Sequence, residues 1–203
     1  MEKLDLYREH KAEYAAKKTP VLIDVGPALY LEIEGQGAPG GETFEKKMGA
    51  LYGVAFTIKM TRKFAGLDDY KVCGLEGLWW TDRRGADFLS VPREQWRWTL
   101  IIRTPEFVTE KDVRNAKAAL RTKGRGPEVE EVRLAKIEEG SCVQILHVGP
   151  YESEMESIRL MDSLVAEKQL KRHGKHHELY LSDPRRVAPQ KLRTILRHPV
   201  KRT

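Results

Sequence analysis

The sequence predicts an α+β protein built from two tandem β-α-β-β repeats with pseudo-two-fold symmetry. Residues 74–82 and 175–183 are matching apolar and aromatic runs, each closed by a hydroxyl residue and an aspartate. Each run is followed by a further apolar strand, at 95–105 and at 190–200. Strand-like and helix-like periods also alternate within each half, which is typical of helices layered on an antiparallel sheet. We therefore expect antiparallel sheets around a central ligand cleft, with the helices on the outer face.

The first half is expected at residues 20–104, after an N-terminal arm at 1–19. Residues 53–70 have no clear period and are expected to be irregular. The expected elements are a strand at 21–24, a bulge at Gly26-Pro27, a strand at 28–34, a helix capped by Thr43, and strands at 72–80 and 96–103.

Residues 35–40 spell G-x-G-x-x-G directly after a predicted strand. Pro39 and the pair Gly40-Gly41 keep this loop open, and no parallel strand follows at the spacing of a dinucleotide-binding unit. We therefore expect no nucleotide, and no other cofactor.

A linking helix is expected at 105–127, with its start at 109–112 and its end at Gly124 to Pro127. The second repeat, at 128–203, then follows the plan of the first. Its expected elements are strands at 132–138 and 143–148, a helix at 153–169, and two strands in the runs 175–183 and 190–200.

The bulk properties are those of an ordinary globular protein of one or two domains. The chain has 203 residues, of which 40% are hydrophobic and 33% charged, as is usual for such proteins. No run of about 18 apolar residues is present, so we expect no membrane partner. The first residues lack an apolar signal core, so we expect a cytoplasmic location. Cys73 and Cys142 make no disulfide framework, and we expect both to be reduced.

The formal net charge of +6 would permit nucleic-acid binding. The basic residues are dispersed, however, and the densest basic stretch is the tail at 193–202. No aromatic-basic strand motif and no helix-turn-helix pattern is present. We therefore interpret the charge as a solvated basic surface and expect no nucleic-acid partner.

Glu178 is the candidate catalytic residue, because it is an acidic residue where the first repeat has Gly77. The period of two in a strand puts His176 and Tyr180 on the same side as Glu178. A carboxylate within an apolar strand is unfavourable unless it is paired or functional. A salt bridge across the sheet or an outward edge position is the alternative. Burial among aromatic side chains would raise the pKa of Glu178, which suits a general base.

The aromatic residues supply the candidate ligand-binding side chains. All four tryptophans fall in two adjacent predicted strands, and flat aromatic or cationic ligands favour such a lining. Trp79 is the leading candidate because it matches Tyr180 in the repeat, and Trp98 is a further one. Tyr151, at the start of a helix, and Tyr30 are further candidates; for each of these residues, packing in the core is the alternative.

His173, His176 and His177 surround Glu178, which raises the question of a metal site. His176 and His177 point to opposite sides of a strand, and no second group of ligands is evident, so we expect no metal. No Ser-His-Asp or Cys-His signature indicates a covalent nucleophile.

Residues 174–186 and 191–200 resemble the C-terminal block of the GyrI-like (gyrase-inhibitor-like) small-molecule-binding proteins. Residues 148–151 and 77–80 are similar to that family too. The resemblance extends over about residues 20–200 and implies a single domain, 1–203, with a pocket between its halves. The same module is the effector domain of certain multidrug-responsive transcription activators. No DNA-binding segment is attached here, which disfavours a regulator.

The resemblance also implies roles for particular residues. Glu178 matches a glutamate that anchors cationic or polar groups of bulky aromatic ligands. A standalone branch is implied to detoxify DNA-alkylating natural products by hydrolysing their strained cyclopropane, with aromatic residues holding the ligand and the glutamate assisting water attack. Two functions stay open: a cofactor-independent cyclopropanoid hydrolase, and a multidrug-binding protein that sequesters or senses such compounds. Inhibition of DNA gyrase is implied by the family name alone, and the sequence predicts no oligomeric state.

Overall fold

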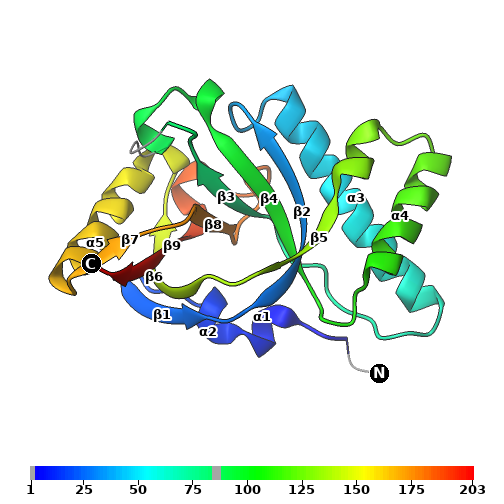
Figure 1. The fold of residues 1–203 in the computed structure, drawn as a ribbon, viewed down its shortest axis with the longest axis horizontal. Helices are drawn as coiled ribbons and strands as arrows, with labels where there is room; N and C mark the ends of the chain where they lie inside the picture. Colours follow the sequence, from blue (N-terminus) through cyan, green and yellow to red (C-terminus); the bar gives the residue numbers. More distant parts are fainter. Residues whose placement is uncertain (1–2, 84–87) are drawn as a thin grey trace. The chain divides into compact units, whose positions relative to one another are not determined.

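The structure is a computed structural model that describes residues 3–83 and 88–203 (Figure 1). It divides into two compact units, and each unit draws on two segments of the chain. Unit 1 comprises Met1–Glu9 and Ala28–Ile137, and unit 2 comprises His10–Pro27 and Glu138–Thr203. Both contain antiparallel strands with helices, so the α+β class is confirmed.

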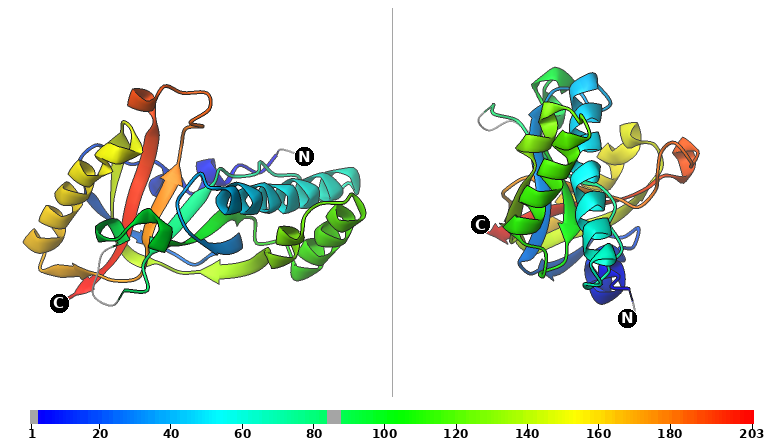
Figure 2. Two further views of the ribbon diagram at one scale, coloured as in Figure 1. Left: turned by 90° about the horizontal axis from the view of Figure 1, so that it is seen from above. Right: turned by 90° about the vertical axis from the view of Figure 1, so that its right-hand side faces the viewer.

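Unit 1 is a four-stranded antiparallel sheet in the order β3-β4-β2-β5. Helices α3 and α4 pack together and lie side by side in both views of Figure 2. The strands and helices are α1 (Leu6–Glu9), β2 (Ala28–Gln36), α3 (Glu42–Phe64), β3 (Glu76–Trp80), β4 (Arg97–Thr104), α4 (Glu110–Thr122) and β5 (Arg133–Ile137).

Helix α3 is longer than the sequence predicts, so the expectation of irregular structure is wrong over residues 53–64. Its buried residues continue at helical spacing beyond Leu51, to Val54 and Ile58. Gly53 lies within this helix and faces Leu120 of α4, where an added Cβ would make ordinary van der Waals contact. Gly41 rather than Thr43 precedes the first turn, without a side-chain cap.

The start of α4 follows the prediction. The Thr109 side chain accepts a hydrogen bond from the Asp112 backbone N–H, and the Asp112 carboxylate accepts one from the Thr109 backbone N–H. This reciprocal pair satisfies donors that a helix N-terminus otherwise leaves open.

Unit 2 has the strand order β1-β6-β9-β8, again antiparallel, and β7 pairs with the end of β9. Helix α5 packs mainly on β6 and β7. The strands and helices are α2 (Lys11–Tyr14), β1 (Val21–Val25), β6 (Gly140–Val148), α5 (Glu154–Glu167), β7 (Leu170–Arg172), β8 (His176–Tyr180) and β9 (Arg193–Arg202).

The first strand of each predicted repeat pairs within the other half of the chain. β1 pairs with β6, and β5 pairs with β2. The expectation that β1 and β2 form one bulged strand is therefore wrong, and the units do not follow the boundaries 20–104 and 128–203. Each unit still contains one β-α-β-β path with the last strand in the middle: β2-α3-β3-β4 in unit 1 and β6-α5-β8-β9 in unit 2. A two-fold axis relating these paths stays a prediction.

The ladders correct the alignment of the two halves by one residue. Gly77 lies opposite Leu100 in unit 1, and Glu178 lies opposite Leu196 in unit 2. If Gly77 is matched with Glu178, Leu100 is therefore matched with Leu196. The alignment of the sequence runs had matched Leu100 with Ile195 instead. In the corrected register Trp98 corresponds to Thr194.

Helix α5 packs on the same face of its sheet as Glu178. His147, Thr194 and Tyr180 lie opposite one another across β6, β9 and β8, so their side chains share a face. His147 Nδ1 is 3.0 Å from Ser157 Oγ on α5, which assigns that face to the helix. The expectation of helices on the side away from Glu178 is thus wrong in unit 2.

The opposite face of unit 2 is covered by the arm around α2. Arg197 donates a hydrogen bond of 2.6 Å to the backbone oxygen of Glu13, and Gln144 donates one of 3.4 Å to that of Ala12. Over the described ranges, no helix has both the length and the apolar character needed to cross a membrane.

Candidate functional site

Glu178 lies in the interior of β8 and is only 7% exposed. The Tyr180 hydroxyl donates a hydrogen bond of 2.8 Å to Glu178 Oε2. His176 Nε2 lies 3.6 Å from the other carboxylate oxygen, Oε1. The period of two along β8 brings these three side chains together, as the sequence predicts.

Burial raises the pKa of Glu178 to about 7, although the Tyr180 hydrogen bond and the nearby His177 act in the opposite direction. Removing a carboxylate from water disfavours its charged form, and a single hydroxyl donor compensates only in part. A carboxyl group with this pKa is available in both protonation states at neutral pH, as a general base requires.

Glu154 is a second buried carboxyl group, which the sequence does not single out. It is the first residue of α5 and is 7% exposed. Burial, followed by the negative charge of Glu178, raises its pKa well above the ordinary value. Acidic residues are common in the first turn of any helix, so nothing in the sequence marks this one.

Tyr151 joins the two carboxyl groups to the aromatic part of the site. It lies in the 3₁₀ turn before α5, and its ring meets the Tyr180 ring edge to face with centroids 6.1 Å apart. Burial and the charges of Glu154 and Glu178 raise the pKa of Tyr151 to about 12. The phenol is therefore neutral and can present its ring or its hydroxyl to a ligand.

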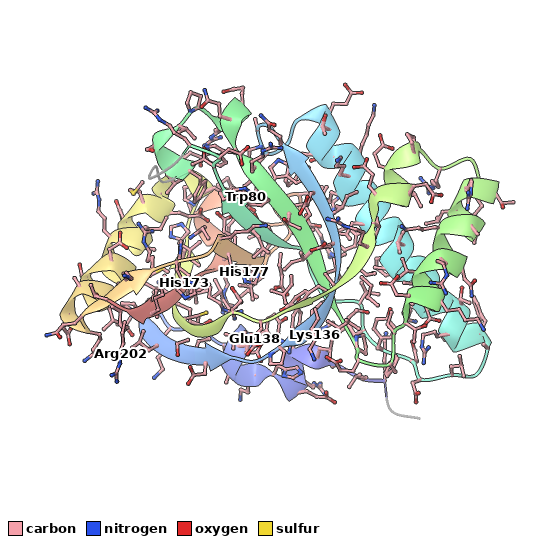
Figure 3. The ribbon with its side chains drawn as sticks, in the orientation of Figure 1. Trp80, Lys136, Glu138, His173, His177 and Arg202 are labelled. Atoms are coloured by element: carbon pink, nitrogen blue, oxygen red, sulfur yellow. The ribbon has the colours of Figure 1, made fainter. Side chains whose placement is uncertain are left out.

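The histidines around Glu178 do not converge. Burial holds the pKa of His176 well below its usual value, with the nearby His198 and His177 in support, so His176 is neutral. His177, labelled on β8 in Figure 3, faces the other side of the sheet, where its Nδ1 lies 3.0 Å from Glu139. His173 precedes β8 and is exposed (Figure 3). Among the residues that the structure describes, no cluster suited to a metal ion occurs.

Trp79 and Trp98 belong to a packed aromatic group in unit 1. Trp79 lies opposite Trp98 across β3 and β4, and both contact Phe44 of α3, with ring centroids at 6.2 and 5.1 Å. Trp98 is fully buried and donates a hydrogen bond of 3.2 Å to the Gly37 backbone oxygen. Trp79 is 2% exposed, and its indole N–H has no hydrogen-bond partner within the described residues.

Tyr30 lies on the other face of the unit 1 sheet. It is opposite Arg103, in the alternate register from Trp79 and Trp98. There it is buried against Ala28, Leu78, Ile101 and Ile137. The structure therefore does not bring Tyr30 together with the tryptophans.

The predicted site residues thus fall into two groups. Unit 2 holds Glu178 with Tyr180, Tyr151 and His176, and unit 1 holds Trp79 with Trp98. A cleft that these groups share stays a prediction.

The chain can be compared with known families now that its fold and the buried carboxyl groups have been described. A model of the GyrI-like small molecule binding domain matches residues 98–201, just over half of the chain. The chain belongs to this family.

Three solved structures from Listeria innocua are similar to the chain over 98% of its length and 100% of theirs. The first is an uncharacterised conserved protein, with 40% identity and a TM-score of 0.91. The other two are described as hydrolases, with 39% and 38% identity and TM-scores of 0.87 and 0.89. A comparison with curated proteins gave no match.

Proposed function

We propose that this protein hydrolyses the activated cyclopropanes of bulky, aromatic, DNA-alkylating compounds in the cytoplasm, with Glu178 assisting the attack of water. The observation that supports this proposal is the Glu178 carboxyl group, which is buried, hydrogen-bonded by Tyr180 and has a pKa of about 7. The similarity to two solved structures described as hydrolases also supports it.

Hydrolysis of an activated cyclopropane requires one general base and a surface that holds a flat molecule. Ionised Glu178 takes a proton from water as the water oxygen attacks a cyclopropane carbon. The Tyr180 hydroxyl holds Oε2, and we assign the acceptance of the proton to Oε1, from which His176 Nε2 lies 3.6 Å away. Release of ring strain supplies much of the driving force, so the reaction needs no cofactor. The Tyr151 and Tyr180 rings provide aromatic contact.

A protein that only binds and sequesters such compounds is the second candidate. The same carboxyl group beside two tyrosine rings suits a cationic aromatic ligand, because an anion and aromatic faces both attract a cation. The two candidates share a site and differ in turnover.

The deciding experiment is incubation with an activated spirocyclopropane indole, followed by mass spectrometry of the water adduct. Wild-type protein is expected to form the adduct faster than buffer alone. Glu178→Gln should lower that rate by about 10²–10⁴, the usual contribution of a general base. Glu156→Gln is the matched control, because Glu156 is an exposed glutamate nearby in the first turn of α5.

Two outcomes would contradict the proposal. If Glu178→Gln turns over substrate at the wild-type rate, Glu178 is not the base. The second outcome is binding without turnover. In that case the ligand quenches the tryptophan fluorescence of the wild-type protein in a titration, and yet the protein forms the water adduct no faster than buffer alone.

A further inference from the structure

Glu154 is a buried acidic residue that has no role in the proposed mechanism, in which Glu178 alone assists the attack of water. Its side chain is more than nine-tenths buried, and its Oε1 atom has no hydrogen-bond partner in the part of the chain that the structure describes. A buried polar atom without a partner costs free energy, unless a ligand or a reacting group supplies that partner.

The helix that begins at Glu154 does not account for this burial. A carboxylate near a helix N-terminus is favoured by the helix dipole whether or not it is buried. Glu156, in the same turn of α5, is exposed to solvent. The burial of Glu154 therefore reflects its position beside Tyr151 and Glu178 rather than its position in the helix.

The surroundings of Glu154 favour its protonated form. Burial and the charge of Glu178 both raise its pKa, and Glu152 adds to the effect. A protonated carboxyl group is an O–H donor, whereas a carboxylate only accepts. The other titratable groups on this face of the sheet, on η4 (Tyr151–Ser153) and beside α5 include Tyr151, His147, Arg172 (paired with Asp162), His176, Tyr180, His198 and Arg202.

We propose that Glu154 is the proton donor of the hydrolysis, acting on the carbonyl oxygen that is conjugated to the activated cyclopropane. This inference rests on the proposed function and deepens it. The two carboxyl groups then have complementary roles: Glu178 accepts a proton from water, and Glu154 gives one to the carbonyl oxygen.

The step balances in atoms and electrons. The water oxygen bonds to a ring carbon and loses a proton to Glu178. One carbon–carbon bond of the cyclopropane breaks, and its electron pair moves through the conjugated system to the carbonyl oxygen. That oxygen takes the proton of Glu154, so one water is consumed and the product carries an alcohol and an enol, which is a phenol where the substrate is a spirocyclopropane dienone.

The pair also returns to its starting state without an external acid. After the step Glu178 is protonated and Glu154 is charged. Glu178 then releases the proton that it took from water, and Glu154 takes up the proton that it gave away. The proton released equals the proton taken up, so a turnover needs no net acid.

The test compares two spirocyclopropane dienones, one of which carries an electron-withdrawing group that makes the product phenol more acidic. A more acidic phenol needs less help from a proton donor. We expect Glu154→Gln to lower kcat by about 10²–10⁴ on the less acidic substrate and by a clearly smaller factor on the more acidic one. Glu178→Gln should lower both rates by the same factor, and Glu156→Gln should lower neither.

An equal loss on both substrates in Glu154→Gln would indicate a structural role and overturn the inference, as would no loss. A second measurement is independent of turnover: carbon-13 NMR titration of labelled glutamate carboxyl groups. Glu154 should titrate well above the ordinary range in the wild type, and its pKa should fall in Glu178→Gln.

An ordinary pKa for Glu154 would exclude it as the donor whatever the activity. If instead Glu154 titrates high and the wild-type protein turns over neither substrate, the proposed function fails and the inference fails with it.

Discussion

At the scale of single residues, two buried glutamates in unit 2 show how the surroundings decide the charge of a carboxyl group. Burial alone would raise the pKa of Glu139, but the adjacent His177 and Arg197 outweigh it and lower the value to about 2. Arg197 Nη1 lies 3.0 Å from Glu139 Oε2. Glu178 has Tyr180 as its hydrogen-bond donor and its pKa is about 7. The first arrangement suits a structural ion pair and the second a reactive group.

We predict that the ionisation of Glu178 raises the activity as the pH increases and lowers the free energy of unfolding over the same range. The base is active only when ionised, so kcat/KM should fall as the pH decreases through about 7. The folded-state pKa lies above the unfolded value of about 4.3. The contribution of Glu178 to stability is therefore fully present below pH 4.3 and is lost as the pH rises through 7.

Glu178→Gln should consequently remove the acidic limb of the rate profile and raise the urea midpoint at pH 8 relative to wild type. Rates across pH 5–9 and urea unfolding at pH 5 and pH 8 provide the check. A midpoint that is lower at pH 8 in the variant would mean that the raised pKa is not present in the folded protein.

At the scale of elements, the pairing of β2 with β4 depends on the absence of a side chain at Gly35. Gly35 lies opposite Trp98, and a Cβ added at Gly35 would overlap the Trp98 indole ring. Because Trp98 is fully buried against Phe44, it has no room to move aside.

We predict that Gly35→Ala destabilises the protein by about 1–3 kcal/mol, the usual cost of overpacking a core. Gly26→Ala is the matched control, because Gly26 has open space where a Cβ would stand. Urea unfolding followed by circular dichroism measures both variants. Equal midpoints for the two variants would show that the indole can shift at little cost.

At the scale of the whole molecule, the chain interleaves the two units. Unit 2 begins at His10–Pro27 and resumes at Glu138, after the unit 1 segment Ala28–Ile137. Unfolding unit 1 would thus turn the connection within unit 2 into a long flexible loop, which costs closure entropy. We therefore expect the two units to unfold together.

Glu139→Gln tests this coupling, because Glu139 is in unit 2 whereas all four tryptophans are in unit 1. Removing the carboxylate leaves Arg197 buried without this partner, which typically costs about 3–5 kcal/mol. We predict that tryptophan fluorescence, a probe of unit 1, reports a lower urea midpoint in this variant.

The control for this experiment is Glu138→Gln, an exposed neighbour in the same segment (Figure 3). It should leave the fluorescence midpoint unchanged. The opposite outcome is a Glu139→Gln variant with two separate transitions. Its far-UV circular dichroism would then show an additional transition at lower urea, while its tryptophan fluorescence would follow the wild-type transition. That result would show that the units unfold independently.

The sequence by itself determined those features that depend on neighbouring residues. The capping box at Thr109 and Asp112, the helix α5 and the shared face of Glu178 and Tyr180 follow from periods of 3.6 and two, which act over a few residues. The resemblance of the C-terminal block indicated the family for the same reason, because the quoted motifs are local.

Only the tertiary structure decided which strands pair and which side chains are buried. β1 pairs with β6 and β5 pairs with β2, so each strand joins the sheet of the other half of the chain. No local sequence signal indicates this pairing, since an edge strand can pair with any exposed neighbour of suitable register. The burial of Glu154 likewise arises because α5 lies on the face that carries Glu178, which no spacing within the helix reveals. Long-range packing sets the solvation of a carboxyl group, and solvation sets its charge and so its chemistry.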